Sequence, residues 1–207
     1  MSRGDEEAVS RLPSSYSFNN ITDHYFTTRY WIPEFAVKKS VVYAGLLGDQ
    51  RVLWLPNGIC VVTLAKSHPV IAENKTISKI DFQVTKSIDR AANQVSGGKK
   101  HGAQMVKPFD SLCYINCDDG SKFKIAACVK GRLMEVNWRL AETSTDTESV
   151  TNQFKLVKDE EVFNGGWIAI LLAATSLQSS ESSRSDTGLV TTEVYCKYLA
   201  SKSTENT

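Results

Sequence analysis

The hydrophobic positions of this chain recur mainly in short runs with the two-residue period of a β-strand. Within Ile77–Thr85, the side chains of Ile80, Phe82 and Val84 fall on one face and polar residues on the other, which predicts a half-buried strand. The stretch Gly58–Ala65 is β-branched and almost wholly apolar, and an Asn-Gly turn opens it, so a buried strand is predicted there too. The pattern indicates a protein built mostly from strands.

Three more short strands are predicted in the middle of the chain, where the sequence reads LCYINC, KFKIAACV and RLMEVN. The segments DDGS and KG between them have good turn chemistry, and short strands joined by tight turns predict a small barrel or sandwich. GWIAILLA is expected to be its final buried strand. We expect Val129, Leu133 and Val136 to be buried, Gly131 to take a positive φ, and a bulge near Glu135, where the alternation fails.

Helical spacing is weaker and confined to two places. SIDRAANQV has mild helical character, and GLVTTEVYCKYLA places Val190, Val194 and Leu199 on one face, with Thr191 or Thr192 as a possible N-cap. The C-terminal helix is expected to dock on the barrel or on a partner.

Composition divides the chain into one folded domain and polar peripheral segments. The predicted division is a disordered tail at 1–20, a folded domain at 21–174 that contains an atypical apolar insertion at 36–56 and a flexible loop at 141–153, a Ser-rich linker at 175–187, a helix at 188–200 and a tail at 201–207.

Charge and cysteine content narrow the functional classes. The 207 residues carry a formal net charge of +1, which disfavours strong binding to nucleic acid or membranes by the chain as a whole. The first residues lack the apolar core of a secretory signal, and the longest apolar stretch, Gly165–Thr175, is too short to span a bilayer. The five cysteines are an odd number, which favours reduced thiols in the cytosol or nucleus.

Catalytic and metal-binding patterns are weak. The three histidines are His24, His68 and His101, and no Ser or Cys stands in a known nucleophile motif. Cys113 and Cys117 have C-x₃-C spacing without a second ligand pair, so we interpret them as small buried side chains rather than a zinc site. We expect no enzymatic activity, no metal and no cofactor.

Two turns offer candidate contacts for a partner. VSGGKKHGAQ lacks the spacing of a phosphate-binding loop and is interpreted as a turn, but Lys99, Lys100 and His101 form the densest basic cluster of the chain. The second turn is the hairpin CDDGSKF, and the candidate residues in and beside it are Asp118, Asp119, Lys122 and Lys124.

The ending GRLMEVN…GGWIAIL resembles the closing strands of carrier domains for lipoate and biotin, which bear a modified lysine at the tip of a hairpin. Lys122 is the lysine nearest to the corresponding tip. DDGSK differs from the E-A-M-K-M and E-S-V-K-A motifs of those domains, and Lys122 is out of register with the lysine of the glycine cleavage H protein. A group-carrier domain that uses Lys122 stays the alternative to a binding domain.

Several blocks together resemble the Abitram family, also called Simiate. They are DHYFTTRYWIP, NGICVVTLAKSHPVI, VSGGKKHGAQ, LCYINCDDGSKFKIAACVKGRLMEVN and GWIAILL, in the family's order. The resemblance implies a barrel-sandwich hybrid of the single-hybrid-motif group, similar to the H protein. The stretch 36–56 departs from the family by being longer and more apolar.

The same resemblance implies function. It implies binding to G- and F-actin, modulation of actin polymerisation, filopodia and dendrite branching, and a nuclear role in speckles linked to transcription. The implied locations are the nucleus and the cytoplasm with its projections, including growth cones. No actin-contacting residues transfer from the family. Direct binding to nucleic acid is not expected, because the chain is nearly neutral and lacks an aromatic RNA-binding motif.

Overall fold

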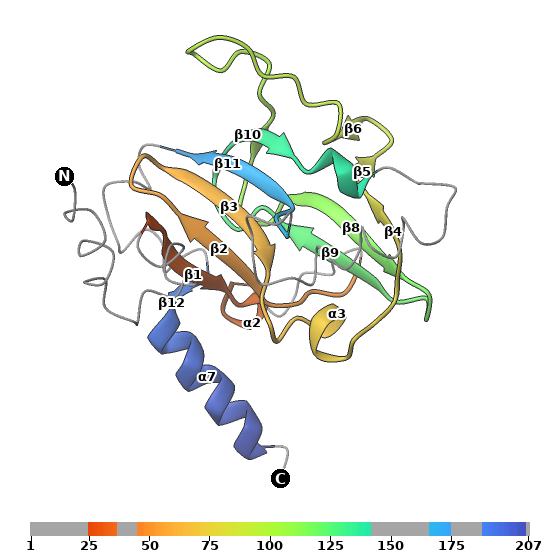
Figure 1. Cartoon of the computed structure of the whole chain (residues 1–207), viewed down its shortest axis with the longest axis vertical. Helices are drawn as coiled ribbons and strands as arrows, with labels where there is room; N and C mark the ends of the chain where they lie inside the picture. The colour runs from red at the N-terminus through yellow and green to blue at the C-terminus, as the bar shows by residue number, and fades with distance from the viewer. Residues whose placement is uncertain (1–24, 37–44, 142–165, 175–187, 206–207) are drawn as a thin grey trace, which may run out of the picture.

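The computed structural model describes residues 25–36, 45–141, 166–174 and 188–205, and shows a mostly β protein with one long flanking helix (Figure 1). The strands are β1 (Thr27–Trp31), β2 (Gln50–Trp54), β3 (Ile59–Leu64), β4 (Ile77–Asp81), β5 (Gln83–Thr85), β6 (Ile88–Asp89), β7 (Met105–Val106), β8 (Ser111–Cys117), β9 (Lys122–Ala126), β10 (Gly131–Val136), β11 (Ala169–Ala173) and β12 (Leu189–Thr191). The helices are α2 (Pro33–Ala36), α3 (Pro69–Ala72), the 3₁₀ turn η2 (Trp138–Leu140) and α7 (Thr192–Glu205).

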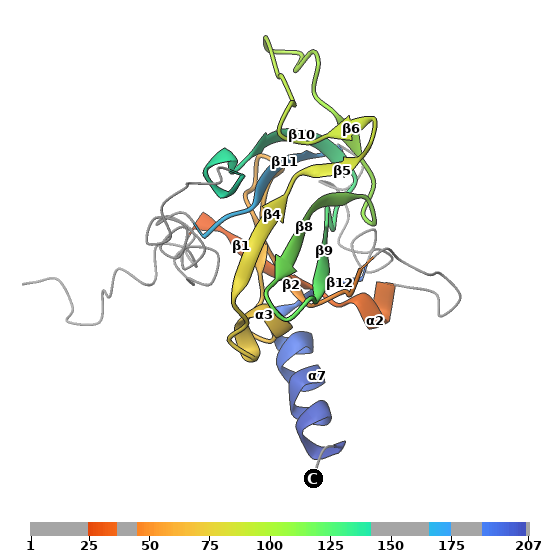
Figure 2. The ribbon, with the colours of Figure 1, turned by 90° about the vertical axis from the view of Figure 1, so that its right-hand side faces the viewer.

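The strands form antiparallel sheets that pack on one another. The largest sheet has the order β12-β1-β2-β3-β11-β10-β7, a second has the order β4-β8-β9, and β5 pairs with β6. One hydrophobic core joins the two larger sheets, with Val62 and Leu171 contributed by the first and Ile115 and Phe123 by the second (Figure 2). In the part of the chain that the structure describes, the sheets do not close into a barrel.

The mostly β prediction is confirmed, and the predicted strands at β3, β8, β9, β10 and β11 are present. Val129, Leu133 and Val136 are buried, and the pairing of β10 with β11 shifts register between Leu133 and Glu135, which is the predicted bulge. β-Branched and aromatic residues favour these pleated, half-buried positions. Burial alternates along β10 and β11, whereas β3 and β8 are buried along almost their whole length and are identified by their apolar composition.

Four predictions about elements are wrong. The helix expected at 188–200 begins only at Thr192 and ends at Glu205, because Leu189–Thr191 form β12. The stretch 87–95 is not helical: it forms β6 and then turns, where the Asp89 carboxylate accepts the N–H of Ala91 at 2.8 Å. The predicted strand over Ile77–Thr85 is two strands, β4 and β5, that break at the buried Phe82. β11 is not the final strand, because β12 follows it and pairs with β1.

The stretch 36–56, expected as an insertion at the edge of the domain, supplies a central strand. Its second half contains β2, which pairs with β1 on one side and with β3 on the other. Val52 and Leu53 are fully buried. Gln50–Trp54 is thus an integral part of the largest sheet rather than an addition to it.

Gly131 does not have the predicted positive φ. The turn before β10 instead uses Cys128, a buried residue with φ of 63°. Gly131 is required for a different reason: a Cβ there would lie 2.3 Å from the Leu172 oxygen of the neighbouring strand β11. The position needs a glycine because two backbones approach closely, not because of turn geometry.

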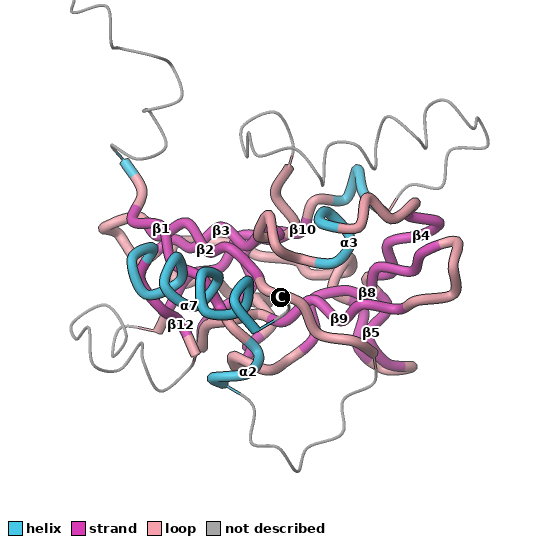
Figure 3. Tube along the Cα trace, turned by 90° about the horizontal axis from the view of Figure 1, so that it is seen from below, coloured by secondary structure: helices cyan, strands magenta, loops and turns pink. Residues whose placement is uncertain are grey.

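The C-terminal helix α7 docks on the edge of the largest sheet, beside β12 and β1 (Figure 3). The Tyr195 ring stacks on Tyr30 with 3.9 Å between centroids, and its hydroxyl donates to the Asp49 carboxylate at 3.1 Å. Lys202 forms an ion pair with Glu34 at the far end of the docked face. The expected docking on the folded domain is confirmed.

The N-cap of α7 yields a first testable prediction. The Thr191 hydroxyl accepts the N–H of Val194 at 3.3 Å, which confirms Thr191 as the N-cap. Replacing it with alanine is expected to destabilise α7 by about 1 kcal/mol, because one amide at the start of the helix loses its partner. Hydrogen exchange of the amides in the first turn measures this loss. Thr192→Ala is the matched control, and equal exchange in the two variants would contradict the capping role.

The tail 1–20, the linker 175–187 and residues 142–153 of the predicted flexible loop lie outside the described residues.

Candidate functional site

The β8–β9 turn is an exposed hairpin, as the sequence indicated. Asp118, Asp119 and Gly120 are exposed. The Asp119 carboxylate accepts bonds from the Lys75 ammonium at 2.6 Å and from the Ser121 N–H at 2.9 Å, and these bonds hold the pKa of Asp119 well below its usual range. The same contact with Asp119, with further help from Glu73, raises the pKa of Lys75. The turn is therefore tied to the segment that follows α3, and Asp118 is its exposed acidic group that forms no ion pair with the described residues.

The two lysines of β9 have different surroundings. Lys122 is exposed, with its ammonium 4.2 Å from the centre of the Tyr114 ring. Lys124 is only 7% exposed, and this burial lowers its pKa, so its prediction as a surface contact is wrong. The reason is that the backbone of Leu46 lies along β9, accepting from the Lys124 N–H and donating to the Lys122 carbonyl, each at 2.8 Å.

The position of Lys122 also bears on the carrier alternative. A swinging lysine must stand at the tip of its hairpin, where the attaching enzyme can reach it. Lys122 instead lies within the β8–β9 ladder, opposite Asn116, and the tip is Asp119-Gly120. The local geometry does not favour a group-carrier site.

The basic cluster forms a second, separate surface. Lys99 and His101 are exposed and Lys100 is partly exposed. Mutual backbone bonds between Ser96 and His101, at 2.9 and 3.0 Å, close the loop, and the Arg132 guanidinium donates to the Lys99 carbonyl at 2.6 Å. Figures 1 and 2 place this yellow-green loop at the end of the molecule away from α7, far from the β8–β9 turn. The predicted site residues are thus divided between two surfaces.

Two of the three histidines lie among the described residues, and they differ. His101 belongs to the exposed basic loop, whereas His68 is fully buried against Phe123. The His68 Nδ1 accepts the N–H of Val70 at 3.2 Å, which makes His68 the N-cap of α3. Burial lowers the pKa of His68 to about 3. His68 therefore stays neutral at physiological pH and acts in the structure as a cap.

His68 gives a pH-dependent prediction. An unfolded histidine has a pKa of about 6.5. Between pH 6.5 and 3 the unfolded chain binds a proton that the folded chain excludes, so the stability contributed by neutral His68 is present above this window and lost as pH falls through it. We expect His68→Asn, which can keep the cap, to remove a slope of about 1.4 kcal/mol per pH unit from the free energy of unfolding. Denaturant titrations across this window measure it, and parallel curves for both proteins would contradict the assignment.

Four of the five cysteines are buried side chains. Cys113 and Cys117 are buried on β8, as predicted, and burial raises the pKa of the Cys113 thiol. None of the five cysteines, all of them within the described residues, forms a disulfide, and only Cys196, on α7, is exposed. Within the described ranges, no group of three or more His, Cys, Asp or Glu side chains is placed to hold a metal ion.

Comparison with known proteins connects the chain to one family. No family model matches it. It is 33% identical to Protein Abitram of Bos taurus over 195 residues, which is 94% of this chain and 92% of the relative. It is 35% identical to Protein Abitram of Homo sapiens, covering 85% of this chain and 84% of the relative. Protein Abitram of Dictyostelium discoideum is 30% identical over 68% of this chain and 81% of its own length.

The chain belongs to the Abitram family. The resemblance inferred from the sequence blocks is therefore confirmed. The family's name carries no enzymatic activity and assigns no site residues. The described part of this Abitram-family chain contains no helix long and apolar enough to cross a bilayer.

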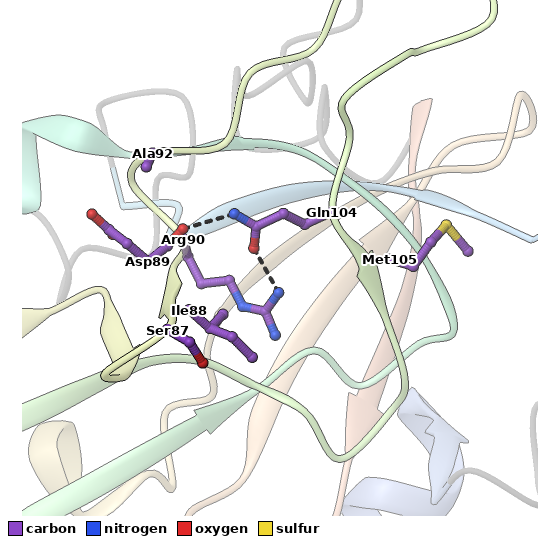
Figure 4. Close-up of a pocket in the computed structure, with 7 residues that line it drawn as sticks. All are labelled: Ser87, Ile88, Asp89, Arg90, Ala92, Gln104 and Met105. Carbon is purple, nitrogen blue, oxygen red and sulfur yellow. Dashed lines mark hydrogen bonds between the residues drawn. The ribbon is translucent and has the colours of Figure 1, made fainter.

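Sequence reasoning missed one further surface of this Abitram-family protein. A cleft of about 510 Å³ lies between β6 and β7 (Figure 4). Its lining residues are Ser87, Ile88, Asp89, Arg90, Ala92, Gln104 and Met105. The sequence did not indicate this cleft, because a helix was predicted over SIDRAANQV. In such a helix Arg90 would be an ordinary solvated side chain.

Proposed function

We propose that this protein is a non-enzymatic actin-binding protein that modulates actin polymerisation and so the growth of filopodia and dendrite branches. The observation that carries the proposal is membership of the Abitram family over most of the chain. The proposal includes a second, nuclear role in speckles, linked to transcription. The corresponding locations are the nucleus and the cytoplasm with its projections.

The Lys99–His101 loop supports the proposal as a contact surface. It presents exposed cationic side chains on a backbone that two cross-loop bonds and Arg132 hold in place. Actin is acidic overall, so a cationic loop steers the two proteins together. Because ions screen charges over about 10 Å at 0.1 M ionic strength, this contact weakens as salt is added.

Reversing the charge of the loop tests this surface. We expect Lys99→Glu/Lys100→Glu to reduce binding to actin filaments at least about tenfold at low ionic strength, since attraction becomes repulsion. The measurement is the fraction of purified protein that pellets with filaments. Lys86→Glu/Lys130→Glu, at two exposed lysines outside the loop, is the matched control for net charge.

The control distinguishes a specific contact at the Lys99–His101 loop from a general effect of net charge. Equal losses in the two double variants would show that only net charge matters. If the loop variant binds as the wild type does, the loop is excluded as the contact, and the exposed Asp118 and Lys122 of the β8–β9 hairpin become the next surface to test.

A further inference from the structure

The cleft between β6 and β7 contains a buried cation that forms no ion pair with any of the described residues. Arg90 is only 5% exposed. Its Nε donates to the Ser111 carbonyl at 3.1 Å, and its Nη1 donates to the Gln104 side-chain oxygen at 2.7 Å. Gln104 is itself fixed, because its amide donates to the Asp89 carbonyl at 2.7 Å. These contacts orient the guanidinium but are made to neutral groups, so they do not themselves neutralise its charge.

No acidic side chain of the described residues pairs with Arg90. Asp110 raises the pKa of Arg90, while burial, the larger influence, lowers it. Asp89 lines the cleft, but its carboxylate accepts the N–H of Ala91 and points away from the guanidinium (Figure 4). Of the five N–H donors of a guanidinium, Arg90 uses two within the described structure. The remaining donors on Nη1 and Nη2 have the fork geometry that a carboxylate accepts with both oxygens.

The walls of the cleft add apolar contacts and a strand edge. Ile88 is 38% exposed and Met105 is 59% exposed, both high values for large apolar side chains. Met105 lies on β7, the outermost strand of the largest sheet. Met105 pairs with Arg132, while the Leu133 N–H bonds to the Gln104 carbonyl at 2.8 Å. In this antiparallel pattern the N–H and C=O of Met105 point away from β10, toward the open edge.

We propose that this cleft binds an extended acidic peptide segment of a partner protein, laid along the open edge of β7. A glutamate or aspartate carboxylate of the segment pairs with the free fork of Arg90. An apolar neighbour in the segment covers Ile88 and Met105, and its backbone bonds to the backbone of Met105. A small inorganic anion satisfies only the first contact and leaves the apolar wall uncovered. None of the lining residues belongs to the Lys99–His101 loop, which connects the two walls of the cleft, and the proposal does not depend on the actin proposal.

The test uses the full chain and two peptide pools. One pool contains seven-residue peptides with glutamate fixed at the centre and randomised flanks, and the other has glutamine at the centre. We expect the protein to retain the glutamate pool at least about tenfold better, and to select apolar residues beside the glutamate. Selected peptides should shift the NMR signals of the Arg90 Nε–H and the Met105 amide. Inorganic phosphate alone should shift Arg90 without shifting Met105.

Variants distinguish a specific loss of peptide binding at the cleft from a general loss of structure. Met105→Glu, at an exposed position on the wall of the cleft, adds a negative charge that repels an acidic segment and should abolish retention, whereas Met105→Gln should weaken it only in part. Arg90→Lys keeps the charge but loses the fork, and should reduce retention at least about tenfold. Equal retention of the two pools, no retention of either, an equal effect of phosphate on both signals, or peptide shifts confined to the Lys99–His101 loop would each overturn the proposal.

Discussion

Replacing Gly131 with valine is expected to lower the free energy of unfolding by about 3 kcal/mol, the upper end of the usual cost of overpacking. A Cβ at this position would meet the Leu172 oxygen at 2.3 Å and the Ala173 Cα at 3.0 Å, both of them backbone atoms of β11. The backbone atoms of a paired strand cannot move to relieve this overlap, whereas the end of a flexible side chain could. Gly131 pairs with β7 on its other side, so the strand cannot move away without breaking a second ladder.

Denaturant unfolding of Gly131→Val measures this cost, and Gly98→Val is the matched control. A Cβ at Gly98 meets no atom within 4 Å, so the control should unfold within about 0.5 kcal/mol of the wild type. For a chain of this size, the loss at Gly131 corresponds to a fall in Tm of about 6 to 12 °C. A normal Tm for Gly131→Val would show that β10 and β11 do not approach as described.

Replacing Gln50 with leucine is expected to cost about 3 kcal/mol as well, through lost hydrogen bonds rather than overlap. Gln50 is fully buried at the start of β2. Its amide donates to the Ala126 carbonyl at 2.9 Å, and its oxygen accepts the Ala126 N–H at 2.8 Å, so one side chain links the two larger sheets. Leucine has a similar size but removes both of these buried hydrogen bonds, and the Ala126 carbonyl keeps only the weak Cys128 Sγ donor at 3.4 Å. A buried backbone group that loses its partner costs about 1–3 kcal/mol.

Gln83→Leu is the control for this substitution. The Gln83 side chain is exposed and, among the described residues, bonds to the nearby Thr85 carbonyl alone, at 2.7 Å. Its loss should therefore change the free energy of unfolding by less than about 0.5 kcal/mol. Equal stability of the two leucine variants would contradict the role of Gln50 as a link between the sheets.

The strands of the middle of the chain were predictable by a local rule, because short apolar runs bounded by turn residues form strands. β3 and β8 are such runs and are buried along almost their whole length, while β10 alternates and its bulge after Leu133 marks the point where the alternation fails. The rule fails where distant segments decide burial. Lys124 looks like a solvated position in KFKIA, but the backbone of Leu46, far away in the sequence, lies along that edge of β9. Gly131 was recognised as important, but its reason, contact with β11, depends on pairing that no local pattern encodes.

The candidate surfaces were predictable to different degrees. Glycines and lysines in sequence identified the exposed basic loop, because turn chemistry is local. The cleft around Arg90 was not predictable, because it depends on segments distant in sequence that the side chain of Asn93 holds together. The Asn93 amide donates to the Leu133 carbonyl at 2.9 Å, and its oxygen accepts the Gln104 N–H at 2.9 Å, which positions Gln104 beside Arg90. Nothing in SIDRAANQV indicates those partners.

The claim that this Abitram-family protein binds actin is tested most directly by pelleting the purified wild-type chain with a series of filament concentrations. We predict that the pelleted fraction rises with filament concentration to saturation at low ionic strength, and that it falls as salt is added. Protein that stays in the supernatant at every filament concentration would contradict direct binding to filaments, whatever the behaviour of the variants.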